Sequence, residues 1–131
     1  MNESVFTKII NGELPCYKLY EDERTIAILT IEPNVVGHTL VIPKVQIDQF
    51  NDLDDEMYYA VWKTVKKVAN NNQQKLGTDR IGLSVKGVDV PHTHVHVLPF
   101  NVGNHMGKHE ESPELTHDEF KKLTARLRFD D

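Results

Sequence analysis

The segment HTHVHVLP, residues 92–99, constrains the fold more than any other part of this chain. Its residues alternate with a period of two, which is typical of a β-strand with two different faces. The histidines His92, His94 and His96 share one face, with neighbours roughly 6.5–7 Å apart. The other face carries Thr93, Val95 and Val97. We therefore expect the face with the valines to pack against a helix and the histidine face to be the open one.

The longest periodic segment predicts a helix that begins after Asp52 or Asp54 and stops at Gly77. Apolar residues recur there every three or four positions, which places them in one stripe. The stripe consists of Leu53, Met57, Val61, Val65 and Val68. This segment is therefore the main candidate to cover a sheet.

Shorter helices are predicted at residues 4–12, with Ser4 as N-cap, and at 116–127, where Thr116 and Glu119 fit a capping box. Strands are predicted at 17–22, 25–31, 38–43, 80–87 and 92–99, the last two joined by a short hairpin around Val88 and Asp89. The strands cluster in sequence instead of alternating with helices. This order favours an α+β fold with an antiparallel sheet.

The composition argues against several classes of protein. A chain of 131 residues fits one domain, and its net charge of −5 argues against a broad nucleic-acid surface. No apolar run approaches the roughly 20 residues of a membrane span, and the N-terminus does not read as a signal peptide. We expect a cytoplasmic protein that binds neither membrane nor nucleic acid. The single cysteine, Cys16, cannot form an intramolecular disulfide.

Three interpretations of the histidine row compete at this point. Imidazole is a common zinc ligand, but three histidines of one strand do not converge on one ion, so His105 or His109 would have to complete such a site. Near neutral pH, imidazole also serves as a nucleophile or a proton donor in phosphoryl chemistry. The third interpretation is a polar sheet face without chemistry.

Three stretches together resemble the histidine triad superfamily: HTHVHVL, FTKIINGELPCYKLYED and AILTIEPNVVGHTLVIPK. The resemblance covers roughly residues 4–100 in consistent order. It implies a single α+β domain over residues 1–131 with one five-stranded antiparallel sheet, and residues 101–131 as a C-terminal tail and helix. It also implies a homodimer and the binding of a small nucleotide, with no cofactor.

The resemblance further implies hydrolysis or transfer at the α-phosphate of phosphoramidates or dinucleoside polyphosphates, through a nucleotidyl-histidine intermediate. By motif position, His94 is the nucleophile, His96 contacts the phosphate or the bridging atom, and His92 supports the row. His38 belongs to the second stretch and is interpreted as a hydrogen-bonded structural histidine.

The chain departs from the family pattern at several positions. Ser4, Thr7 and Gln46 stand where many relatives carry ligands of a structural zinc, so we expect no metal. Thr30 stands where a carboxylate often holds the ribose, and Asp89 stands where a hydroxyl commonly contacts phosphate. The candidate substrate-contacting residues are Thr30, Ser84, Gly87, Asp89 and Gln46.

Two functions therefore remain open. The intact histidine row favours a nucleotide hydrolase or nucleotidyl transferase. The changes at Thr30, Val88 and Asp89 favour a low-turnover nucleotide-binding or scaffold module with the same fold.

Overall fold

The computed structural model describes residues 2–103 and 112–129. Its helices are α1 (Val5–Ile10), α2 (Asp55–Leu76) and α3 (His117–Leu127), with a 3₁₀ turn η1 (Phe50–Asp52) before α2. Its strands are β1 (Tyr17–Glu21), β2 (Thr25–Leu29), β3 (Thr39–Pro43), β4 (Arg80–Ser84) and β5 (Val95–Phe100). They form one antiparallel sheet in the order β1-β2-β3-β5-β4, which confirms the predicted α+β fold.

The helix ends follow from local capping chemistry. The Asp54 side chain accepts a hydrogen bond from the Met57 amide at the start of α2, and Gly77 ends that helix in the left-handed conformation. At the start of α3, Thr116 and Glu119 form the predicted capping box. Such contacts join residues only three or four positions apart, and for this reason the helix ends could be predicted from the sequence.

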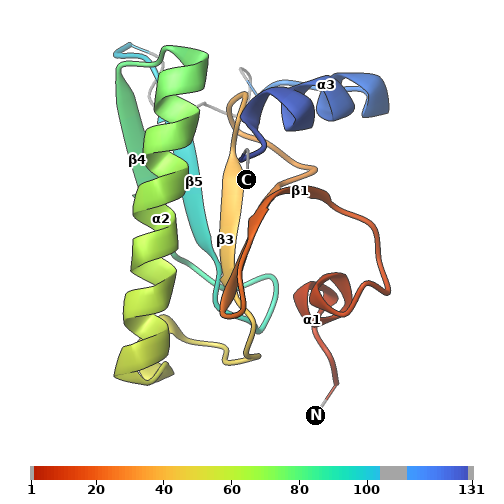
Figure 1. The fold of residues 1–131 in the computed structure, drawn as a ribbon, viewed down its shortest axis with the longest axis vertical. Coiled ribbons are helices and arrows are strands. Elements are labelled where there is room, and N and C mark those ends of the chain that lie inside the picture. Colours follow the sequence, from red (N-terminus) through yellow and green to blue (C-terminus); the bar gives the residue numbers. More distant parts are fainter. Residues whose placement is uncertain (1, 104–111, 130–131) are drawn as a thin grey trace.

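Both faces of the central strands are covered, so β2 and β3 are buried along their whole length. Figure 1 shows α2 on one side of the sheet and α1 on the other. On the α2 side, Ala27 of β2 and Val41 of β3 pack with the valines of α2 and β5. On the α1 side, Phe6 packs with Ile28 and Leu40. The predicted stripe of α2 belongs to the first cluster.

Helix α3 covers the outer strand β1. Tyr17 stacks on Phe120, with ring centroids 4.8 Å apart and an angle of 14° between the planes. Leu19 and Leu127 are buried in the same cluster, and the Phe129 amide donates to the Leu19 carbonyl at 3.0 Å. At the opposite edge, β4 pairs with β5 alone among the strands of the described residues.

Two predictions about the second half of the sheet are wrong in detail. β4 ends at Ser84 and β5 begins only at Val95, so a loop of residues 85–94 replaces the predicted short hairpin. His92 and His94 therefore precede the strand on which they were placed. Within the described residues, no helix is long and apolar enough to cross a membrane.

Candidate active site

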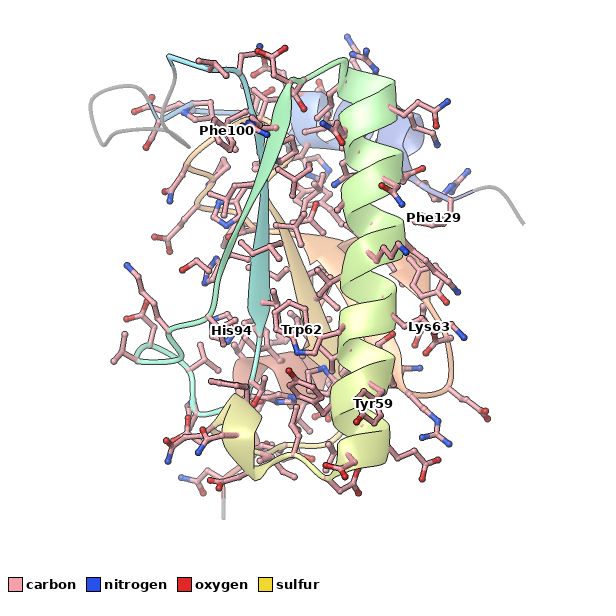
Figure 2. All side chains as sticks on the ribbon, turned by 90° about the vertical axis from the view of Figure 1, so that its left-hand side faces the viewer. Tyr59, Trp62, Lys63, His94, Phe100 and Phe129 are labelled. Atoms are coloured by element: carbon pink, nitrogen blue, oxygen red, sulfur yellow. The ribbon has the colours of Figure 1, made fainter. Side chains whose placement is uncertain are left out.

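The histidines gather where β5 begins, on the sheet face opposite α2. His96 lies in β5 between Leu40 of β3 and Ser84 of β4. Figure 2 labels His94 at the start of β5 and Phe100 at its end. Thr93 and Val95 are buried, and Val95 packs on the α2 side. The alternation of side chains thus holds, although only His96 belongs to the strand.

The expectation that the histidine face is open is wrong for two of the three rings. His92 is 0% exposed and His94 is 6% exposed. The Phe6 side chain of α1 lies edge-on against both rings, with centroid distances of 5.8 Å to His92 and 4.9 Å to His94. Helix α1 therefore covers this part of the face, which the local sequence around the histidines could not indicate.

The contacts of His94 leave one ring nitrogen available for chemistry. Its Nδ1 lies 2.8 Å from the His92 carbonyl oxygen. A carbonyl only accepts hydrogen bonds, so Nδ1 carries a proton, and in the neutral form of the ring Nε2 holds the lone pair. Within the described residues, Nε2 has no hydrogen-bond partner. A neutral imidazole held in this tautomer is suited to nucleophilic attack.

A second chain of hydrogen bonds fixes the proton on His96. The Asn34 amide donates to His38 Nδ1 at 3.0 Å, so the His38 proton must lie on Nε2. His38 Nε2 lies 2.9 Å from His96 Nδ1 and donates to it. The remaining His96 nitrogen, Nε2, then carries a proton and faces outward as a donor. His38, interpreted from the sequence as a structural histidine, thus sets the tautomer of a site residue.

Burial keeps this pair neutral. Burial and the neighbouring His96 lower the pKa of His38 from 6.5 to about 4. Burial, His94 and Lys86 lower the pKa of His96 to about 4, while Asp89 opposes the shift. Both rings therefore carry a single proton at neutral pH, as their hydrogen bonds require.

His92 is buried below the site, and both of its ring nitrogens are bonded to other groups of the protein. Its Nε2 donates to the Pro43 carbonyl at 2.8 Å, and its Nδ1 lies 2.7 Å from the Ser4 hydroxyl. Burial is the largest of the effects that lower the pKa of His92. A fully buried ring with both nitrogens engaged supports its neighbours and cannot itself reach a substrate.

A cavity of about 300 Å³ adjoins the histidines, between the loop of residues 85–94 and the segment around η1. His94 lines it, together with Lys86, Gly87, Gln49 and Asn51. Gly87 has a φ of 69°, a left-handed conformation that favours glycine. Asp48 also lines the cavity, which is therefore surrounded by an imidazole, one cation, two amides and one carboxylate. The cation and the amides are groups that suit a phosphate ester.

The other predicted substrate residues take different places. Thr30 follows β2, and its amide donates to the His38 carbonyl at 3.2 Å. Ser84 pairs with His96 across the sheet, and Asp89 is exposed in the 85–94 loop. The Gln46 side chain accepts from the Ser4 amide and the Thr7 hydroxyl and donates to the Asn2 carbonyl. A role of these four residues toward substrate stays a prediction.

The described residues contain no group of three side chains of His, Cys, Asp or Glu that could hold a metal ion. His105 and His109, considered above as further ligands, lie outside the described residues. Sequence reasoning did not assign Asn34 or Lys86 to the site. Lys86 directly precedes Gly87, a predicted substrate-contacting residue, and this neighbourhood was the signal that could have assigned Lys86 to the site.

Comparisons with known proteins agree with this fold. The family model of the HIT domain matches residues 11–102, so the chain belongs to the HIT family. An uncharacterized HIT-like protein of Borreliella burgdorferi is 36% identical over 135 residues, covering 97% of both chains. The crystal structure of a Hit-like protein from Bartonella henselae superposes with a TM-score of 0.86 at 28% identity, covering 98% of this chain and 96% of that one.

Two relatives have names that state an activity. Adenosine 5′-monophosphoramidase hnt1 of Schizosaccharomyces pombe is 33% identical over 100 residues, covering 72% of each chain. Adenylylsulfatase HINT3 of Arabidopsis thaliana is 36% identical over 103 residues, covering 75% of this chain and 52% of that protein. The family thus includes enzymes that act on nucleotides.

Proposed function

We propose that this chain is a nucleotide hydrolase or nucleotidyl transferase that reacts at the α-phosphate of nucleoside phosphoramidates or dinucleoside polyphosphates. The observation that carries the proposal is the state of His94. Its Nδ1 proton is held by the His92 carbonyl, and its Nε2 lone pair is unengaged in a residue that lines the cavity. The names of the two relatives support a nucleotide as substrate.

In the first step, the His94 Nε2 lone pair attacks the α-phosphorus. For a phosphoramidate the P–N bond breaks, and the amine leaves with the electron pair of that bond and takes up one proton. The nucleotidyl group is then bonded to His94, whose ring carries the positive charge. The His92 carbonyl stabilises that charge by accepting the Nδ1 proton in a hydrogen bond.

In the second step, water attacks the same phosphorus, the bond to His94 breaks, and one proton is released. The proton taken up in the first step is thereby balanced, and neutral His94 is regenerated. His96 Nε2–H donates to the bridging atom or a phosphate oxygen in both steps, because the chain from Asn34 through His38 keeps the proton on that nitrogen. Gly87, Ser84 and Thr30 are the proposed contacts to phosphate and ribose.

The test is turnover of an adenosine 5′-phosphoramidate ester by the native protein, His94→Ala and His117→Ala. We expect the first variant to lose turnover and the second, which removes an exposed histidine of α3, to retain it. The mass of the native protein, quenched during turnover, should increase by one adenylyl group. Native protein that binds the nucleotide without turnover would favour the binding module and overturn the proposed reaction.

The homodimer implied by the family stays a prediction, and the mass of the native protein in solution tests it. If the protein is a monomer at the concentration of the activity assay, a second subunit contributes nothing to the site.

A further inference from the structure

A group of polar side chains joins helix α1 to His92 without contacting the cavity. It consists of Ser4, Thr7, Gln46 and His92, and we call it the Ser4 cluster. Ser4 is 6% exposed and His92 is 0% exposed. The Ser4 hydroxyl lies 2.7 Å from His92 Nδ1, across 88 residues of sequence. The proposed reaction uses none of the three residues that surround His92.

The direction of each hydrogen bond in the Ser4 cluster follows from its neighbours. His92 Nε2 donates to the Pro43 carbonyl, so Nδ1 holds a lone pair and the Ser4 hydroxyl must donate to it. The Ser4 oxygen accepts from the Thr7 amide at 3.0 Å, as an N-cap.

The Ser4 proton has two acceptors within reach in the cluster, His92 Nδ1 at 2.7 Å and the Thr7 hydroxyl oxygen at 3.2 Å, and the contact with His92 is the shorter one. Thr7 donates its own proton to the Gln46 side-chain oxygen at 2.7 Å, and the Ser4 amide donates to that same oxygen at 2.8 Å. The Gln46 amide group donates to the Asn2 carbonyl at 2.8 Å. The Thr7 hydroxyl lies 3.4 Å from His92 Nδ1, whereas the Ser4 hydroxyl lies 2.7 Å from it. The arrangement that uses the shortest contacts therefore directs the Thr7 proton to Gln46 and the Ser4 proton to His92.

The Ser4 cluster is connected to the His94 ring through the main-chain carbonyl of His92. The carbonyl of His92 accepts the Nδ1 proton of His94, so the position of residue 92 sets the orientation of the His94 ring. Helix α1 supplies a second contact, because Phe6 lies against the His94 ring. Helix α1 and its N-cap thus contact the site twice: Ser4 bonds to His92, whose carbonyl orients His94, and Phe6 packs against the His94 ring.

We propose that Ser4 is a positioning residue for His94: its hydroxyl anchors the His92 ring, and the His92 carbonyl then keeps the His94 lone pair on Nε2. This inference rests on the proposed function. Ser4 does not line the cavity, so its effect falls on the reacting geometry and not on substrate binding.

The experiment compares native protein with Ser4→Ala, Ser4→Thr and Thr7→Val, using the adenosine phosphoramidate ester. Ser4→Ala should lower kcat about tenfold, the rate equivalent of one buried hydrogen bond, with KM changed less than about twofold. Ser4→Thr retains a hydroxyl and should restore kcat. Thr7→Val is the matched control, because it removes the hydroxyl that bonds to Gln46 and makes longer contacts with Ser4 and His92, but keeps the 2.7 Å contact between the Ser4 hydroxyl and His92.

A spectroscopic measurement separates positioning from loss of stability. Ring ¹⁵N signals distinguish a protonated nitrogen from one with a lone pair, and the His94→Gln spectrum assigns the signals of His94. Native protein and Thr7→Val should show a single tautomer protonated at Nδ1, and Ser4→Ala should show a mixture. If Ser4→Ala does not fold, Ser4→Cys, which retains the volume with a weak donor, takes its place.

The positioning role is overturned if Ser4→Ala keeps the single tautomer, or if its kcat falls no further than that of Thr7→Val. A raised KM with unchanged kcat also overturns it. If the native protein does not turn over the ester, the proposed function fails. The ring spectra of native protein and Ser4→Ala still decide the positioning role, so the two failures are distinguishable.

Discussion

The neutral histidine pair predicts that the fold loses stability in mild acid. Well above pH 6.5 the imidazole of residue 38 is neutral in both the folded and the unfolded chain. As the pH falls, the unfolded chain takes up a proton that the folded chain resists until about pH 4, where the pKa of His38 lies. The stability present at neutral pH is therefore lost progressively between these two values.

The size of this loss follows from the difference between the two pKa values. Because folding lowers the pKa of His38 from 6.5 to about 4, the free energy of unfolding is expected to be about 2 kcal/mol lower at pH 5 than at neutral pH. His96, whose pKa is also lowered to about 4, adds to the loss. The two contributions sum to less than twice the single value, because the rings share one hydrogen bond.

The assay is urea unfolding followed by Trp62 fluorescence at pH 7.5 and pH 5, on native protein and His38→Gln. A glutamine amide can donate to His96 Nδ1 in place of the imidazole Nε2, but it does not titrate. We expect His38→Gln to lose about 2 kcal/mol less than native protein between these pH values. If the two proteins lose the same free energy within about 0.5 kcal/mol, His38 does not have the lowered pKa and the argument is refuted.

Further predictions concern other positions. Gly37→Ala should destabilise the fold by about 2 kcal/mol or more, because φ is +89° and an added Cβ would lie 2.5 Å from Leu76 Cδ1; an unchanged melting temperature would contradict this. Thr116→Ala should cost about 1 kcal/mol in urea unfolding through loss of the capping box, and no cost would mean that α3 does not limit stability. Thr30→Asp should tighten AMP binding about fivefold by calorimetry if residue 30 contacts the ribose, and equal affinity would remove Thr30 from the site. Dialysis against a chelator should leave the melting temperature unchanged, and release of one metal ion per chain would overturn the expectation of no metal.

The features predicted correctly from the sequence are those that depend on near neighbours. The N-caps Ser4 and Thr116 bond to groups three residues away, and the stripe of α2 repeats within one turn. The strands were predicted with small errors at their ends, because apolar alternation continues past the last pair of the ladder. Val95 rather than His92 begins β5, since the ladder with β3 starts there.

The features missed by the sequence depend on contacts between distant segments. The bond between His38 and His96 exists only because β3 pairs with β5 in the register that places Leu40 opposite His96. The burial of His94 requires Phe6, a residue of a helix near the start of the chain. Neither contact leaves a trace in the local pattern of residues 92–99, which correctly indicated the strand and the shared side of the histidines.

The covering of β1 by α3 has a consequence for how many molecules can associate through their strands. A sheet with two free edges can add neighbours on both sides, and such growth has no natural limit. Here the Phe129 amide donates a hydrogen bond to the Leu19 carbonyl of β1, and α3 packs over that strand. Among the described residues, one edge of β4 has no partner strand. Strand addition to β4 would use the sheet edge that is unpaired within residues 2–103 and 112–129, and would stop at a pair. The C-terminal helix thus obstructs strand addition at β1, and we predict that a variant shortened before Thr116 forms larger assemblies than the full chain.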